Sequence, residues 1–238
     1  IDVPMTLMGA GQTDDGSGTI LDGGTYGQGV DNTGLGTAWP RAIVIQSDDV
    51  VLKNLRIRDY QGDQTTTGGY AIVARAESSW GVTDPTIDNL VIEDITFDDC
   101  YYGAREKNVV DALVQNTTYL INTGAPSYAV YITNSTGTTV RANTFDQAPI
   151  WVTDATYGTI GGPDPSDGNV LTNIIYNGIW YGQQFASGTS SEKGLIQNNT
   201  VSGAAEGGIV VWNWAGETAD SIRILDNTVT GAAGGSDN

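Results

Sequence analysis

Short apolar segments recur along the chain, separated by turns rich in Gly, Asn and Asp. In one set, each segment ends in an aromatic or branched residue that follows an Asn or Asp by two or three positions. Repetition at intervals of mostly 22 to 30 residues indicates a stacked repeat architecture. The apolar residues are Ile57, Phe97, Tyr119, Phe145, Ile175, Val201 and Val229, and the polar residues ahead of them are Asn54, Asp94, Asn116, Asn143, Asn173, Asn199 and Asn227.

Two further columns of apolar segments complete each repeat. Three short strands per repeat of about 20–30 residues are typical of a parallel β-helix coil. We therefore predict an all-β chain that folds as a right-handed parallel β-helix, a solenoid of about seven coils of three short strands. The second column is 42–45, 71–74, 103–106, 129–132, 149–152, 178–181 and 208–211, and the third is 50–52, 90–92, 112–114, 139–140, 170–171, 195–196 and 222–224.

Stacking explains why like residues repeat at like positions. A single coil cannot bury its inward apolar residues, but coils about 4.8 Å apart supply each strand with hydrogen-bonded neighbours on both sides. An Asn repeated at one turn can then pass side-chain hydrogen bonds from coil to coil. The alternative is that each Asn satisfies only its own turn. Both interpretations are structural, so we assign the Asn column no chemistry.

The pattern Asn-Thr-Phe or Asn-Thr-Val, then Gly-Ile, then Val-x-Leu runs over essentially the whole chain. It resembles the pectate-lyase-like superfamily of right-handed β-helices, as does the opening segment 4–11. The resemblance implies the fold and leaves the function open. That superfamily includes lyases, hydrolases and epimerases of acidic polysaccharides, viral tailspikes, and surface proteins with no known reaction.

We predict one domain over residues 1–238, with loop excursions at 23–40 and 61–85 that either form a binding face or cover sheet edges. Members of the superfamily usually begin with a capping helix, and none precedes Ile1. Residues 230–238 form a turn without a visible cap. Uncapped solenoid ends are open sheet edges. We therefore expect the chain to be a segment of a longer one, or partners to cover its ends.

Charge and composition exclude several classes of partner and of catalytic site. The net charge of −18 repels phosphate groups, and no run of 18 apolar residues occurs, so we expect neither nucleic acid nor membrane insertion. Histidine is absent, which removes Ser-His-Asp triads and His-ligated zinc, and the single Cys100 cannot form an internal disulfide. We expect an extracellular or cell-surface protein with calcium as the candidate cofactor.

One face of the second column gathers aromatic and basic residues. If Ile72, Ala104 and their equivalents point inward, the next residue of each strand points outward. Aromatic rings stack on sugars, and Arg or Lys binds uronate carboxylates. Alternatively, these rings pack under loops or between chains, and a shift of one residue would turn them inward. The candidates for a polysaccharide site or an interface are Arg75, Arg105, Lys107, Tyr131, Trp151, Trp180 and Trp212.

The resemblance also implies a catalytic alternative on this face. In lyases of the superfamily, an Arg or Lys abstracts the proton α to the uronate while calcium neutralises the carboxylate. Arg105 and Lys107 are therefore the catalytic candidates. Nearby in the register lie Asn108, Asn134 and Asp154, of which Asp154 is the metal candidate, but they do not make a convincing calcium cluster.

Carboxylate pairs and glycosylation sequons offer further candidates. A glycosidase needs two carboxyl groups about 5–10 Å apart, and the sequence sets no such pair. If the chain is an enzyme, we therefore favour a lyase over a glycoside hydrolase. The carboxylates considered are Glu93, Asp94, Asp98 and Asp99 around one coil, with Asp164 and Asp167 in one turn. The sequons begin at Asn116, Asn134 and Asn198, and we expect Asn134 to be the most accessible.

Two interpretations of function follow. In the first, the chain is a structural or adhesive extracellular module without catalytic activity, which contacts polysaccharide or neighbouring copies of itself. In the second, it is a polysaccharide-processing enzyme, a polyuronate lyase or a glycosidase, that uses the outward Arg, Lys and aromatic face.

Overall fold

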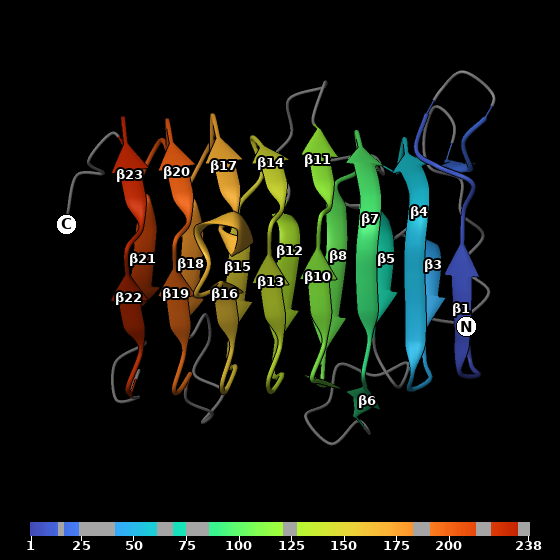
Figure 1. Ribbon diagram of the computed structural model, residues 1–238, viewed down its shortest axis with the longest axis horizontal. Helices are drawn as coiled ribbons and strands as arrows, with labels where there is room; N and C mark the ends of the chain where they lie inside the picture. Colours follow the sequence, from blue (N-terminus) through green and yellow to red (C-terminus); the bar gives the residue numbers. More distant parts are fainter. Residues whose placement is uncertain are drawn as a thin grey trace.

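The computed structural model describes residues 1–13, 17–23, 41–60, 69–74, 86–120, 128–182, 191–212 and 220–232. Within these ranges, parallel strands form a fourteen-stranded sheet A and a seven-stranded sheet B, which face each other along one axis (Figure 1). A short third sheet pairs β6 (Ile87–Asp88) with β9 (Val109–Val110). One turn contains a 3-10 helix, Pro165–Asp167.

Sheet A contains β1 (Met5–Met8), β2 (Ile20–Asp22), β4 (Val50–Arg58), β7 (Val91–Asp98), β10 (Leu113–Gln115), β11 (Thr118–Leu120), β13 (Thr139–Arg141), β14 (Thr144–Asp146), β16 (Thr159–Gly161), β17 (Val170–Thr172), β19 (Leu195–Gln197), β20 (Thr200–Ser202), β22 (Arg223–Leu225) and β23 (Thr228–Thr230). Sheet B contains β3 (Arg41–Ile45), β5 (Tyr70–Ala74), β8 (Tyr102–Lys107), β12 (Tyr128–Thr133), β15 (Ile150–Thr153), β18 (Ile179–Gly182) and β21 (Ile209–Trp212).

A typical coil places two strands in sheet A and one in sheet B. The chain runs through β10 and β11 in sheet A, reaches β12 in sheet B, and enters the next coil at β13. In β4 and β7 the two sheet A strands merge into one long strand, which pairs with the short strands of the adjacent coils. The prediction of a parallel β-helix with three short strands per coil is confirmed.

The core lies between the two sheets and consists of apolar residues stacked in columns. Members of each column are direct partners in the parallel register, and all are at most 1 % exposed. Removing this surface from water is the main force that holds successive coils together. One column is Leu52, Ile92, Val114, Val140, Ile160 and Ile196, and the other is Ile57, Phe97, Tyr119, Phe145, Leu171 and Val201.

One coil is aligned differently from the sequence-based prediction. The pattern assigns Ile175 to the first column and 170–171 to the third, but Leu171 occupies the first column and Ile160 the third. Most coils separate these two strands by a two-residue turn, whereas here 162–169 and the 3-10 helix intervene. The prediction is wrong because sequence spacing does not reveal which turn carries the extra residues.

From Thr117 onward the Asn column is a hydrogen-bonded ladder, which is the first of the two alternatives, with Asn169 in place of Asn173. Asn54, Asp94 and Asn116 instead occupy left-handed turn positions. Asn143, Asn169 and Asn199 each donate Nδ2 to the Oδ1 of the next Asn, at 2.8, 2.8 and 2.9 Å. Each Oδ1 acceptor also receives the backbone N–H of the preceding member. The ladder ends on Asn227 and begins at Thr117, whose backbone N–H and hydroxyl both donate to Asn143 at 2.8 Å.

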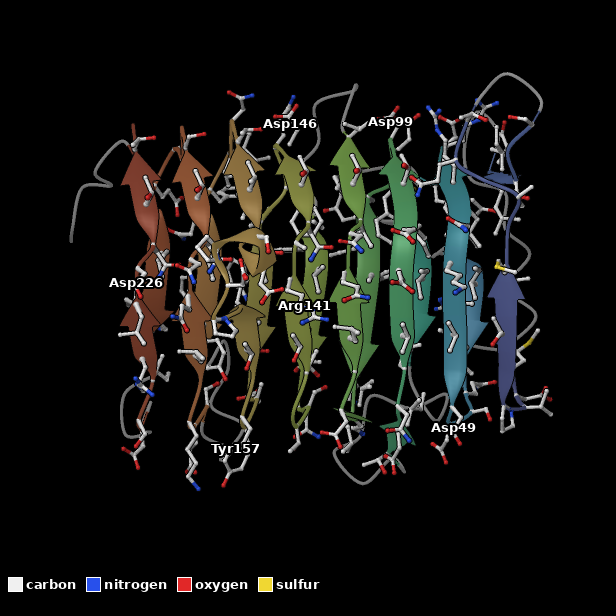
Figure 2. The ribbon with its side chains drawn as sticks, viewed as in Figure 1. Asp49, Asp99, Arg141, Asp146, Tyr157 and Asp226 are labelled. Carbon is white, nitrogen blue, oxygen red and sulfur yellow. The ribbon has the colours of Figure 1, made fainter. Side chains whose placement is uncertain are left out.

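Turn positions explain the abundance of Asn, Asp and Gly. Most of the non-glycine residues with positive φ are Asn or Asp, whose short polar side chains tolerate the left-handed conformation. They recur at the same turns in successive coils. Figure 2 shows three of them: Asp49 and Asp99 lie at opposite edges of the molecule, and Asp226 lies at the turn between β22 and β23.

The two predicted loop excursions fall mainly on residues that the structure does not describe. Residues 24–40, 61–68 and 75–85 lie outside the described ranges. Between the second and third of these segments, β5 occupies Tyr70–Ala74 and pairs with β3 and β8, in agreement with the assignment of 71–74 to the second column. The apolar run 70–74 is fully buried, which is why it forms a strand and not a loop.

Candidate functional site

The outer face of sheet B has the register that the sequence predicts. Val73, Arg105, Tyr131, Trp151 and Trp180 are consecutive partners across β5, β8, β12, β15 and β18. The residues that precede them in each strand are buried: Ile72, Ala104, Val130, Ile150 and Ile179. The alternation of a pleated strand therefore turns the aromatic and basic row outward.

A second outward row, of tyrosines, was missed by the sequence reasoning. Tyr70, Tyr102 and Tyr128 are register partners two positions before the inward residues. The position between each tyrosine and the inward residue also points inward, so the tyrosine itself points outward. In β8 this position is Gly103, where an added Cβ would lie 3.0 Å from the Tyr119 ring. A glycine directly before the inward residue of a second-column strand could have revealed the tyrosine row. Such a glycine marks a bend at which the strict alternation of inward and outward residues fails.

The three tyrosines, Trp151 and Trp180 of the outward row, and Trp212 form a continuous series of ring contacts across six strands of sheet B. Centroid separations are 4.6 Å for Tyr70–Tyr102 and 5.5 Å for Tyr102–Tyr128, both stacked. Tyr128 meets Trp151 edge-on at 5.0 Å, and Trp151 stacks on Trp180 at 4.5 Å with planes 6° apart. Trp212 continues the stack beside Trp180 at 5.9 Å and is 49 % exposed. We call these six residues the aromatic ladder.

Arg105 is built into the ladder at its tyrosine end. Its Nη1 donates to the Tyr70 hydroxyl at 2.5 Å. Its guanidinium also lies over the Tyr70 ring at 5.4 Å and over the Tyr131 ring at 5.1 Å. Burial raises the pKa of Tyr70, with the neighbouring Arg105 charge opposing that rise. The guanidinium is thus held between two aromatic faces in cation–π contact.

Three further residues were predicted on the outer face of sheet B, and the structure describes two of them. Lys107 follows Arg105 by two positions on the same side of β8, beside Thr133, but it is only 7 % exposed. Trp212 lies at the far end of the ladder, on β21. Arg75 lies outside the described residues. The structure therefore brings Arg105, Lys107 and the aromatic side chains to one face.

The candidate metal ligands stack as a turn column. Asn108, Asn134 and Asp154 all have positive φ at the ends of β8, β12 and β15, and Asn134 Nδ2 donates to Asn108 Oδ1. Among the residues that the structure describes, no group of three or more His, Cys, Asp or Glu side chains is arranged to hold a metal ion. Asp154 is therefore not part of such a carboxylate cluster in the described part of the chain.

Four of the six carboxylates considered for glycoside hydrolysis take part in scaffold contacts, and the other two, Asp94 and Asp99, occupy left-handed turn positions. Glu93 accepts from Gln115 at 2.7 Å on the outside of sheet A, and Asp98 forms an ion pair with Arg56. Asp164 accepts the Ser166 backbone N–H at 3.0 Å and so begins the 3-10 helix. Asp167 lies 3.6 Å from Arg141.

The exposure of the three sequon asparagines does not follow the predicted order. Asn134 is half-buried and bonded to Asn108, and Asn198 donates to the Gly162 carbonyl oxygen at 2.8 Å. Asn116 is exposed at a left-handed turn. The expectation that Asn134 is the most accessible is wrong, because the stacking of turn columns ties its amide to the coil before it.

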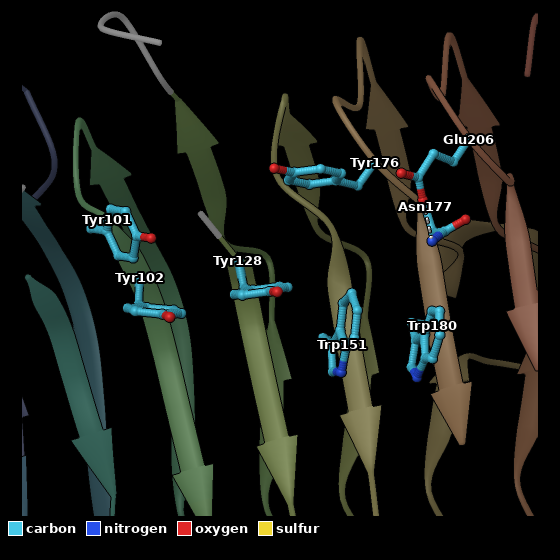
Figure 3. Close-up of a pocket in the computed structure, with 8 residues that line it drawn as sticks. All are labelled: Tyr101, Tyr102, Tyr128, Trp151, Tyr176, Asn177, Trp180 and Glu206. Carbon is cyan, nitrogen blue, oxygen red and sulfur yellow. Dashed lines mark hydrogen bonds between the residues drawn. The ribbon is translucent and has the colours of Figure 1, made fainter. Parts of the chain in front are cut away.

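A pocket of about 380 Å³ opens beside the ladder (Figure 3). Tyr101, Tyr102, Tyr128, Trp151 and Trp180 line its aromatic wall. Burial raises the pKa of Tyr128 to about 12, and also raises that of Tyr102, so both hydroxyls are neutral at physiological pH. The remaining described lining residues are Tyr176, Asn177 and Glu206, and of all the lining residues the sequence predicted only Trp151 and Trp180.

The family description "Right handed beta helix region" matches residues 41–234. The chain belongs to the right-handed β-helix family. The predicted hand of the solenoid is thereby confirmed, together with the all-β fold class and the resemblance to pectate-lyase-like β-helices. No curated protein matches this β-helix. Among the described residues, no helix has the length and apolar character needed to cross a membrane.

Several solved structures are similar to this chain at low sequence identity. The A-module of Azotobacter vinelandii mannuronan C-5 epimerase AlgE6 is 13 % identical, with a TM-score of 0.47, and the match covers 97 % of this chain and 68 % of that one. An alginate lyase from Paenibacillus sp. str. FPU-7 is 12 % identical, with a TM-score of 0.44 and coverages of 96 % and 86 %. The Streptococcus pneumoniae surface protein and adhesin PfbA is 10 % identical, with a TM-score of 0.41 and coverages of 90 % and 89 %.

Proposed function

We propose that this β-helix is a non-catalytic extracellular or cell-surface module that contacts polysaccharide through the outer face of sheet B. The observation that carries the proposal is the aromatic ladder from Tyr70 to Trp212. Its ring centroids succeed one another at 4.5 to 5.9 Å across six strands. Tyr70 is buried at one end, Trp151 and Trp180 are half-buried, and Trp212 is exposed at the other end, so the ladder presents an aromatic strip along the outer face of sheet B. Aromatic walls with a few well-placed polar groups are what ligand sites use.

A lyase remains the second candidate because Arg105 and Lys107 share the same face as the ladder. The contacts of Arg105 argue against it as a proton-abstracting base, since its guanidinium is bonded to Tyr70 and covered by two rings. Incubation with alginate and pectate in the presence of calcium tests this candidate. Ultraviolet absorbance from unsaturated sugar ends would establish lyase activity and overturn the non-catalytic proposal.

The binding proposal predicts a loss of affinity when the ladder is interrupted. Replacing Trp151 or Trp180 by Ala should weaken polysaccharide binding about tenfold, because each removes a stacking surface worth about 1.4 kcal/mol. Native gel electrophoresis through neutral, cationic and anionic polysaccharides measures the retardation of each variant. The control is Tyr157→Asn, which removes an exposed aromatic side chain from a turn that does not line the pocket.

Two outcomes would contradict the proposal. The wild-type protein would pass through every polysaccharide unretarded, or the control would lose as much affinity as the tryptophan variants. The other proposed partner, a neighbouring copy of the chain, is tested separately by measuring mass in solution. A monomer at all concentrations would contradict self-association and leave polysaccharide binding intact.

A further inference from the structure

The pocket beside the aromatic ladder has a marked charge bias. Among the eight lining residues in the described part of the chain, Glu206 is the one charged side chain, and none is basic. Arg105, the basic residue nearest in the outward row, is engaged with Tyr70 and Tyr131 and does not line the pocket. Among these residues, a ligand in the pocket therefore meets aromatic side chains, one amide and one carboxylate.

The carboxylate of Glu206 is positioned by a buried amide. Asn177, which is 7 % exposed, donates Nδ2 to Glu206 Oε2 at 2.9 Å and accepts the Gly207 backbone N–H on Oδ1 at 2.8 Å. Asn177 lies just before β18 and Glu206 just before β21, so two successive coils build the arrangement (Figure 3). The Glu206 side chain is itself exposed, so it can meet a ligand from solvent.

The Glu206 carboxylate and the aromatic lining of the pocket favour a positively charged sugar over a negatively charged one. A protonated amine gains from an ion pair with the Glu206 carboxylate, and the rest of the sugar gains from contact with the aromatic side chains. A uronate would place its carboxylate beside Glu206, in a protein whose net charge is −18, and like charges repel. An uncharged sugar could stack on the rings without using Glu206.

We propose that this pocket binds an amino sugar, with the Tyr128, Trp151 and Trp180 rings against the sugar ring and Glu206 paired with its ammonium group. This inference rests on the proposed polysaccharide-binding function and gives it a substrate class. It assigns the pocket to cationic hexosamine residues and excludes polyuronates from it.

The test compares three hexasaccharides by calorimetry with the whole chain. A β-1,4-glucosamine hexamer carries the ammonium groups, its fully N-acetylated form keeps the same backbone without charge, and a galacturonate hexamer is anionic. Measurements at physiological ionic strength, where the Debye length is about 8 Å, suppress attraction to distant acidic residues. The glucosamine hexamer is expected to bind about tenfold more tightly than the N-acetylated hexamer, and the galacturonate hexamer more weakly than both.

Glu206→Gln is the decisive variant. It should reduce the preference for the glucosamine hexamer to about twofold and leave the affinity for the N-acetylated hexamer unchanged, because only the ion pair is lost. Glu192→Gln is the matched control, since Glu192 pairs in a turn column with Thr156 and Asp220 and does not line the pocket. The control should keep the wild-type preference.

Three results overturn the inference. Equal losses in Glu206→Gln and Glu192→Gln would mean that general negative charge, and not the pocket, attracts the amine. Tighter binding of the galacturonate hexamer would mean that the face selects uronates, while carbohydrate binding itself would stand. If no hexamer binds and Trp151→Ala has no effect on polysaccharide retardation, the proposed function fails together with this inference.

Discussion

Replacing Glu106 by Gln is expected to stabilise the protein at neutral and alkaline pH. Glu106 points into the core from β8, between Ala74 and Ile132 in the register of sheet B, and is fully buried. Neither carboxyl oxygen has a hydrogen-bond partner among the described residues. Burial raises the pKa of this carboxyl to about 8, because the charged form loses its hydration and gains no counter-charge.

The pH dependence follows from that raised pKa. Below the ordinary carboxyl pKa near 4.5, Glu106 is protonated in the folded and unfolded states and costs no ionisation energy. Between pH 4.5 and 8, the unfolded state loses the proton while the folded state keeps it, so stability falls by about 1.4 kcal/mol per pH unit. At pH 7 the accumulated cost is about 3 kcal/mol, and Glu106→Gln removes it.

Urea unfolding at pH 5, 7 and 9 measures this effect. The variant should be more stable than the wild type by a margin that grows with pH up to about pH 8 and then stays constant. Glu93→Gln, on the outside of sheet A, controls for the loss of one negative charge and should keep the wild-type pH slope. If the unfolding free energies of the wild type and of Glu106→Gln declined equally with pH, Glu106 would not be the source of the pH dependence.

Replacing Asn169 by Ala is expected to destabilise the protein by about 4 kcal/mol, because it opens the centre of the Asn ladder. Asn169 donates Nδ2 to the Val140 carbonyl oxygen and to Asn199 Oδ1, both at 2.8 Å. Its Oδ1 accepts the backbone N–H and the Nδ2 of Asn143. The side chain of Asn169 is fully buried, so Ala leaves these partners without water to replace the lost bonds.

The matched control is Asn173→Gly, four residues further along the same coil. Asn173 is exposed and donates Nδ2 to Asp146 at 2.8 Å, and its left-handed φ of 53° suits glycine. Its replacement should cost less than about 1 kcal/mol in the unfolding free energy measured with urea. Equal losses for the two variants would mean that the buried ladder contributes no more than an exposed turn bond.

The outward position of Arg105, Tyr131, Trp151 and Trp180 could be predicted because it depends on local alternation within short strands. Once inward apolar residues are recognised at a constant position in each repeat, the pleat of the strand turns the residue after them outward. The same reasoning, carried one residue further, also places Glu106 in the core. The Asn ladder was predictable for a similar reason, since stacked coils repeat a side chain that hydrogen-bonds to its own copy.

What the tertiary structure alone decided is where coils of unequal length align and which turns approach sheet B. The 3-10 helix at Pro165–Asp167 lengthens one turn, so Asn169 and not Asn173 enters the ladder, and no spacing in the sequence marks the difference. The pocket likewise joins Tyr102 to Glu206, which are separated by 104 positions in the chain. Strand alternation is a property of neighbouring residues, but the meeting of distant turns depends on how many residues each coil uses to complete its circuit. The amino acids therefore determined the β-helix and its aromatic face, and the stacking of the coils determined the pocket.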